Sequence, residues 1–140
     1  MDWTQFDRGV FLINVLGVVY NPKNKKILIG RREKDHYIKK LSWTFPGGRP
    51  AYKEDLEFYL AHEIKIKTGL GVDVKEVVFA KTYPEKREFL SIYYLCEVVG
   101  GKEKAGEKFV DIRWIKPGDV QKYFTTSLHP ILLKYLKTLG

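Results

Sequence analysis

The feature that most constrains the fold is one helical segment in the middle of a chain that otherwise favours β-strands. Within residues 53–68, Leu56, Leu60 and Ile64 recur every four residues, which places them on one face of a helix. Gly69 supplies the stop signal. The segments on both sides are short runs rich in Val, Ile, Leu and aromatic residues, as in strands. The pattern predicts an α/β protein.

Turn residues divide the rest of the chain into separate elements. Strands are expected at residues 10–20, 26–31, 42–45, 72–83, 89–99 and 109–115. A short helix is expected from Pro117 to about Phe124. A last helix, capped by Ser127, would present the apolar side chains of Leu128, Ile131, Leu132, Tyr135 and Leu136. Without repeats or long linkers, residues 1–140 should form a single domain, an α/β/α sandwich around a mixed β-sheet.

Composition narrows the class of protein. The 140 residues include 25 Lys and Arg against 17 Asp and Glu, a net charge of +8 that favours an anionic partner. Cys96 is the only cysteine, which excludes a disulfide framework and a cysteine zinc site within one chain. The longest apolar run, residues 10–20, is too short to span a bilayer, and residues 1–8 lack a secretory cleavage site. We therefore expect a soluble, cytoplasmic protein with no membrane partner.

Residues 42–70 read SWTFPGGRPAYKEDLEFYLAHEIKIKTGL. This stretch resembles the Nudix box of the Nudix hydrolase family, whose pattern is G-x5-E-x7-R-E-U-x-E-E-x-G-U with U aliphatic. The positions that match are Gly48, Glu54, Glu63, Ile64, Gly69 and Leu70. The departures are His62 in place of Arg, and Ile66 and Lys67 in place of two Glu.

The resemblance implies a site that holds Mg²⁺ or Mn²⁺ on a nucleoside diphosphate derivative and cuts a diphosphate bond with activated water. It assigns catalytic roles to Glu63 and Glu54, and metal contacts to Glu63 and the Gly47 carbonyl. Three glutamates at positions i, i+3 and i+4 of a helix would converge on the metal. Here those positions hold Glu63, Ile66 and Lys67, with a total charge of zero. We therefore expect a degenerate metal site and weak or absent hydrolysis.

Three interpretations remain open. The first is a nucleotide binder that needs no metal, in which Lys67 contacts the diphosphate directly. The second is an active hydrolase of the nucleoside diphosphate-sugar or ADP-ribose type with a displaced Mg²⁺ or Mn²⁺ site. Its candidate ligands are Glu54, Asp55, Glu63, Glu85, Glu88, Glu103 and Glu107. The third is a scaffold for a protein or nucleic-acid partner, although the sequence lacks a nucleic-acid-binding signature.

Several residues are candidates for substrate binding around the box. They are Arg31, Arg32, Gly47, Gly48, Arg49, Lys67 and His129. The glycines allow close backbone approach, and the cations suit phosphate. His129 is also a candidate base, because the stretch 126–129 is loosely similar to the tail of GDP-mannose mannosyl hydrolases. Each cation has a plainer alternative as a solvated charge, and Lys67 as the i,i+4 partner of Glu63. A homodimer in which a second protomer lends a carboxylate is also left open.

Overall fold

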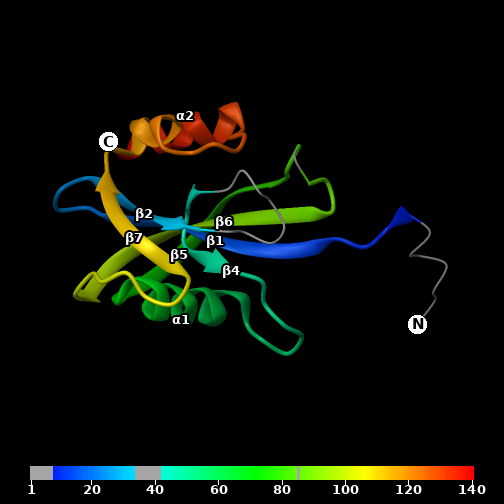
Figure 1. Ribbon diagram of the computed structural model, residues 1–140, viewed down its shortest axis with the longest axis horizontal. Coiled ribbons are helices and arrows are strands. Elements are labelled where there is room, and N and C mark those ends of the chain that lie inside the picture. Colours follow the sequence, from blue (N-terminus) through cyan, green and yellow to red (C-terminus); the bar gives the residue numbers. More distant parts are fainter. Residues whose placement is uncertain (1–7, 34–41, 85) are drawn as a thin grey trace.

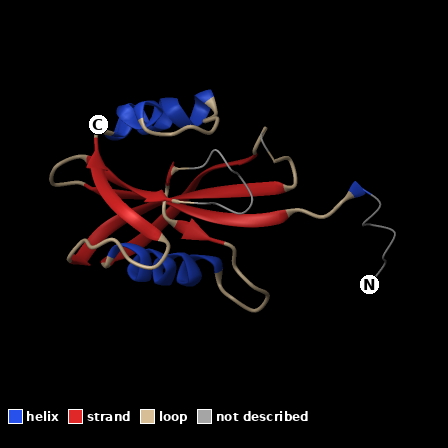
Figure 2. Ribbon diagram, viewed as in Figure 1, coloured by secondary structure: helices blue, strands red, loops and turns tan. Residues whose placement is uncertain are grey.

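The computed structural model describes residues 8–33, 42–84 and 86–140. It shows one β-sheet with a helix on each face, which confirms the expected α/β/α sandwich (Figures 1 and 2). The strands are β1 (Leu12–Asn21), β2 (Lys26–Arg32), β3 (Trp43–Thr44), β4 (Gly47–Gly48), β5 (Leu70–Thr82), β6 (Phe89–Gly101) and β7 (Phe109–Ile115). The helices are α1 (Leu56–Thr68), the 3₁₀ helix η2 (Pro117–Lys122) and α2 (Pro130–Leu139).

The sheet is mixed, as expected. Its main path runs β3-β2-β1-β6-β5, with β4 paired to β1 and β7 paired to β2. β1 and β6 are parallel, from the pair Leu12–Phe89 to the pair Tyr20–Glu97, and the other strand pairs are antiparallel. β1 therefore lies at the centre of the sheet. Its side chains alternate between the two faces, and both faces are buried.

Each face of the sheet packs on one helix. The core on the α1 side contains Val15, Val19, Leu28, Leu60, Ile64, Leu70, Tyr94 and Cys96. The core on the α2 side contains Leu16, Val18, Ile27, Ile29, Phe45, Tyr93, Ile115, Val120, Leu132 and Leu136. Full burial of a leucine or isoleucine side chain contributes about 1.5–3 kcal/mol, so Leu60 and Ile64 are strong anchors for α1. No helix in the described ranges is long and apolar enough to cross a membrane.

The central helix begins three residues later than the sequence pattern predicted. The Asp55 side chain caps α1 by accepting the Phe58 N–H at 3.0 Å, so helical structure starts at Leu56. The predicted stop at Gly69 is confirmed. Gly69 has a φ of 78°, and its N–H donates to the Lys65 carbonyl.

The prediction of Ser127 as the cap of the last helix was wrong. α2 begins at Pro130, and His129 caps it by accepting the Ile131 N–H on Nδ1 at 3.1 Å. Proline lacks an N–H and forces the preceding residue into an extended conformation, so the helix cannot start earlier. The short helix also ends at Lys122 and does not reach Phe124.

The predicted strands missed β4, a two-residue strand that fixes the loop before α1. Gly47 and Gly48 pair with Leu16 and Val15 of β1. A Cβ at Gly47 would collide with the Val15 carbonyl oxygen and approach the Leu16 Cα at 2.9 Å. Only glycine permits this contact between the two backbones.

We expect Gly47→Ala to lower the free energy of unfolding by about 1–3 kcal/mol, because the new methyl group has no space against β1. Gly100→Ala is the matched control, since nothing lies within 4 Å of a Cβ there. Urea denaturation of the two variants and the wild type measures the difference. Equal stability of Gly47→Ala and Gly100→Ala would contradict the packing of β4 on β1.

Candidate functional site

A cavity of about 310 Å³ lies where β4 and α1 meet the end of β1. Residues from strands on both sides of β1, from α1 and from the segment before β7 line it. They are Asn14, Leu16, Arg32, Thr44, Phe45, Gly47, Gly48, Arg49, Tyr59, Glu63, Lys67, Tyr83, Phe89, Glu107 and Lys108. We call this cavity the box pocket. It is framed by rigid elements, because β4 is tied to β1 and α1 is anchored in the core.

The Lys67 ammonium group lies at the wall of the box pocket between two oxygen acceptors. Its Nζ donates a hydrogen bond to the Gly47 carbonyl and lies 3.3 Å from Glu63 Oε1. Lys67 is only 8% exposed, although lysine is rarely buried. Glu63 and Lys67 lie one helical turn apart, so the predicted i,i+4 pair is confirmed. A cation of the protein therefore contacts the carbonyl and the carboxylate that the sequence resemblance assigned to a metal.

Burial and charge act in opposite directions on Lys67. Loss of hydration on burial lowers the pKa of Lys67, because the charged form is less stable away from water. The neighbouring Glu63 carboxylate opposes this and favours the ammonium form, while Arg32 adds a smaller repulsion that lowers the pKa. The ion pair is thus the main support for a charge at this buried position.

Tyr59 holds Glu63 from the other side. Its hydroxyl is hydrogen-bonded to the Glu63 carboxylate, and its pKa is raised to about 12 by burial and then by the charges of Glu63 and Glu54. The phenol therefore remains a neutral hydrogen-bond donor at ordinary pH. A Cβ at Gly48 would collide with the Tyr59 hydroxyl. The second glycine of the loop is thus required for this contact between Tyr59 and Glu63.

The donor set does not fit a divalent metal. Mg²⁺ needs oxygen ligands in an octahedron, whereas the ammonium of Lys67 already contacts both Gly47 and Glu63. Ile66 offers no ligand atom and is partly exposed to solvent. Among the described residues, no three His, Cys, Asp or Glu side chains cluster closely enough to hold a metal ion.

The box pocket carries an excess of positive charge. Its cations are Arg32, Arg49, Lys67 and Lys108, against the carboxylates of Glu63 and Glu107. Inside a partly enclosed cavity such an imbalance attracts anions more strongly than it would on an open surface. Tyr83, Phe45 and Phe89 also line the cavity, but Phe45 and Phe89 are each only 2% exposed, whereas Tyr83 is half-buried. The pocket therefore combines anion attraction with one partly exposed aromatic side chain, Tyr83.

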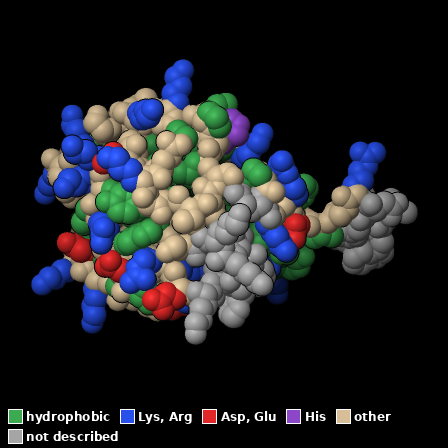
Figure 3. All heavy atoms as spheres, turned by 45° about the horizontal axis from the view of Figure 1, so that its top comes forward, with side chains coloured by type: hydrophobic (Ala, Val, Ile, Leu, Met, Phe, Trp, Pro, Cys, Tyr) green, Lys and Arg blue, Asp and Glu red, His purple; other side chains and the backbone are tan. Residues whose placement is uncertain are grey.

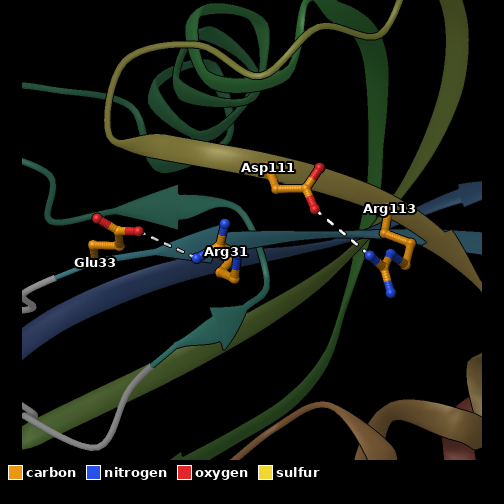
Figure 4. A network of polar contacts seen from close by, with 4 residues as sticks. All are labelled: Arg31, Glu33, Asp111 and Arg113. Carbon is orange, nitrogen blue, oxygen red and sulfur yellow. Dashed lines mark hydrogen bonds and ion pairs between the residues drawn. The ribbon is translucent and has the colours of Figure 1, made fainter.

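The structure brings six of the predicted site residues together in this cavity, namely Arg32, Gly47, Gly48, Arg49, Glu63 and Lys67. Arg31 is not among the lining residues, because successive side chains of a strand point to opposite faces. It forms an ion pair with Glu33 at 3.3 Å, beside the Arg113–Asp111 pair on β7 (Figure 4). The substrate-binding role predicted for Arg31 has no support from this placement.

Glu54 and His129 also lie outside the set of lining residues. The Glu54 carboxylate accepts the Ala51 N–H at 2.7 Å, which closes the turn before α1. His129 caps α2, and the centroid of its ring lies 5.1 Å from the centroid of the Phe79 ring. Both residues thus have structural contacts outside the box pocket, and the catalytic and binding roles predicted for them stay predictions.

Of the acidic residues proposed for a displaced metal site, Glu107 joins Glu63 in the pocket lining. Asp55 is used as the cap of α1, and Glu88 forms an ion pair with Lys86 at 3.2 Å. Glu103 is exposed and is not a lining residue. Glu85 lies outside the described residues.

The sequence analysis missed several lining residues, chiefly Asn14, Thr44, Phe45, Tyr59, Phe89 and Lys108. Tyr59 could have been found, because it lies four residues before Glu63 and thus on the same side of the helix. The others come from distant strands. Only the sheet order brings β1, β3, β6 and the segment before β7 to one cavity.

Comparison with known proteins finds a matching family, related sequences and solved structures of similar fold. A profile of the NUDIX domain matches residues 10–136. The chain belongs to the Nudix family. It is 26% identical to a MutT-like protein from Streptomyces ambofaciens over 112 residues, which are 79% of this chain and 67% of the relative. It is 32% identical to an ADP-ribose pyrophosphatase from Methanocaldococcus jannaschii over 88 residues, which are 61% of this chain and 51% of the relative.

A solved structure supports the Nudix fold. The NUDIX hydrolase from Nitrosomonas europaea superposes with a TM-score of 0.73 at 17% identity, covering 91% of this chain and 71% of the other. The chain thus spans about two thirds of one curated Nudix relative and about half of the other.

We expect Lys67→Met to lower the free energy of unfolding by about 3–5 kcal/mol, because it leaves the Glu63 carboxylate buried without its cation. Glu63→Gln/Lys67→Met should cost clearly less than Lys67→Met alone. Lys75→Met is the control, because Lys75 pairs with Asp73 at 2.9 Å on the exposed surface and should contribute less than about 1 kcal/mol. Chemical denaturation provides the values. Equal costs for Lys67→Met and Lys75→Met would show that the buried pair is unimportant.

Proposed function

We propose that this Nudix-family chain binds a nucleoside diphosphate derivative in the box pocket and that its hydrolysis of the diphosphate is weak or absent. One observation carries the proposal. The Lys67 ammonium contacts the Gly47 carbonyl and the Glu63 carboxylate, where a positive charge would otherwise have to be supplied by a metal.

A lysine can replace a metal's charge but not its chemistry. An ammonium group has three N–H donors. Within the described part of the chain, Lys67 contacts the Gly47 carbonyl and the Glu63 carboxylate, which uses two of these donors and leaves the third for a phosphate oxygen. Binding of the diphosphate is therefore favoured. An ammonium does not coordinate water or lower its pKa as a divalent metal does, so the attacking hydroxide is not generated.

The rest of the box pocket supports the same class of ligand. Arg32, Arg49 and Lys108 add positive charge to the lining of the same cavity. Tyr83, which is half-buried, offers aromatic surface for a base, and Asn14 lies in the same lining. One of the two curated relatives is named an ADP-ribose pyrophosphatase, which favours a nucleotide ligand here.

A second candidate function is an active hydrolase with a displaced metal site. It is favoured by Glu107, which lines the same pocket as Glu63 and supplies a second carboxylate from a distant segment. In this alternative Mg²⁺ or Mn²⁺ would bind between these acids and the substrate phosphates.

We expect nucleotides to bind as tightly in the presence of EDTA as in the presence of Mg²⁺. ADP-ribose, GDP-mannose and nucleoside triphosphates form the test panel, with isothermal titration calorimetry as the measurement. Binding of any panel member in EDTA would support a site that needs no metal. Absence of binding with and without metal would remove the nucleotide proposal altogether.

Hydrolysis of the same panel separates the two candidate functions. We expect wild-type turnover well below about 1 per second, the lower end of ordinary enzyme rates. Ile66→Glu/Lys67→Glu should gain Mg²⁺-dependent turnover, whereas Lys65→Glu, an exposed change on the same helix, should not. Ordinary Mg²⁺-dependent turnover in the wild type would establish the displaced-metal alternative.

A further inference from the structure

A second hollow of about 500 Å³ lies away from the box pocket and shares no lining residue with it. We call it the lysine basin. Its lining residues are Asn24, Lys25, Lys26, Lys116, Pro117, Gly118, Asp119, Lys137 and Gly140. Four of these nine residues are lysines, against one acid.

The lysines come from three segments that meet at one end of the molecule. Lys25 lies in the turn between β1 and β2, and Lys26 is the first residue of β2. Lys116 precedes η2, and Lys137 lies in the last turn of α2. These segments lie side by side at the left of Figure 1. Figure 3 shows Lys and Arg side chains gathered at the same end. The cluster is therefore produced by the fold and not by a run of basic sequence.

The charge of the basin is not balanced by the protein. Among the described residues, none of the four lysine ammonium groups lies within 4.0 Å of a carboxylate. The single acid, Asp119, is paired at 3.4 Å with Lys122, which is not a lining residue. Clustered like charges repel and oppose the compact state, so a bound anion would stabilise this end of the protein.

The turn that contains Lys25 and leads into Lys26 is held in a defined shape. Lys25 has a φ of 56°, in the left-handed region, and its N–H donates to the Asn21 carbonyl at 2.8 Å. The Asn24 side chain accepts the Lys26 N–H at 3.0 Å. Side-chain bonds of this kind fix a turn. The backbone positions of Lys25 and Lys26 are thus set before any ligand arrives.

We propose that the lysine basin binds an oligophosphate, an anion with several closely spaced phosphate groups. Lysine ammonium groups are compact point charges suited to phosphate oxygens. None of the nine lining residues is aromatic, so a nucleobase would have no ring to stack on. The basin therefore recognises the phosphate chain itself, in contrast to the box pocket. The proposal does not depend on the function proposed for that pocket.

The test is a titration of the full chain with inorganic tripolyphosphate, which has no nucleoside, followed by ¹⁵N–¹H NMR. We expect the Lys26 and Gly118 amide signals to shift with saturation. Lys116→Gln/Lys137→Gln should weaken this response about tenfold or more, since two charge-assisted contacts are lost. Lys81→Gln/Lys102→Gln removes the same charge at exposed positions that line neither cavity, and should leave it unchanged.

Two results would overturn the proposal. One is an equal loss of tripolyphosphate binding in the two double variants, which would show that binding depends only on the net charge of the protein. The other is a response confined to residues of the box pocket. A parallel titration with single-stranded RNA separates the two sources of phosphate. If RNA binds through Lys116 and Lys137 and tripolyphosphate does not bind, the basin is a nucleic-acid surface and not an oligophosphate site.

Discussion

The contact of Lys67 with the Gly47 carbonyl and the Glu63 carboxylate joins the two halves of the site. Gly47 belongs to β4, which pairs with β1 in the sheet, and Lys67 belongs to α1, whose buried side chains pack on one face of the same sheet. A buried ammonium is stable only where oxygen acceptors replace its water. β4 and α1 must therefore keep their relative positions for the buried Lys67 ammonium to be stable. The same constraint fixes the shape of the box pocket, which both elements line.

This arrangement separates two properties that a metal would supply together. Positive charge on the pocket wall is retained, now as part of the protein, and it adds to that of Arg32 and Arg49. The ability to ionise water is not supplied by Lys67 itself, because an ammonium group does not coordinate water as a metal does. Binding of phosphates without their hydrolysis is the functional consequence we infer for this member of the Nudix family.

Much of the fold follows from local signals. The periodic leucines and isoleucine of α1, the stop at Gly69 and the alternation of strands were sufficient for the α/β/α sandwich. The cap of α2 lies at His129 and not at the predicted Ser127, because Pro130 holds the residue before it in an extended conformation. The pair Glu63–Lys67 was predictable from helical spacing, but the second contact of Lys67, with the Gly47 carbonyl, was not. It depends on the pairing of β4 with β1, which is set by tertiary structure. The same holds for Glu107 and Tyr83, which line the box pocket but are distant in sequence from Glu63.

The most direct test of the account is the position of Mn²⁺ in crystals grown with Mn²⁺ and ADP-ribose, located by anomalous scattering. The account predicts that Lys67 Nζ keeps its contacts with the Gly47 carbonyl and Glu63, that the nucleotide phosphates lie beside it, and that no anomalous peak is found between those two oxygens. A Mn²⁺ peak coordinated by the Gly47 carbonyl and Glu63, with the Lys67 side chain displaced, would contradict it.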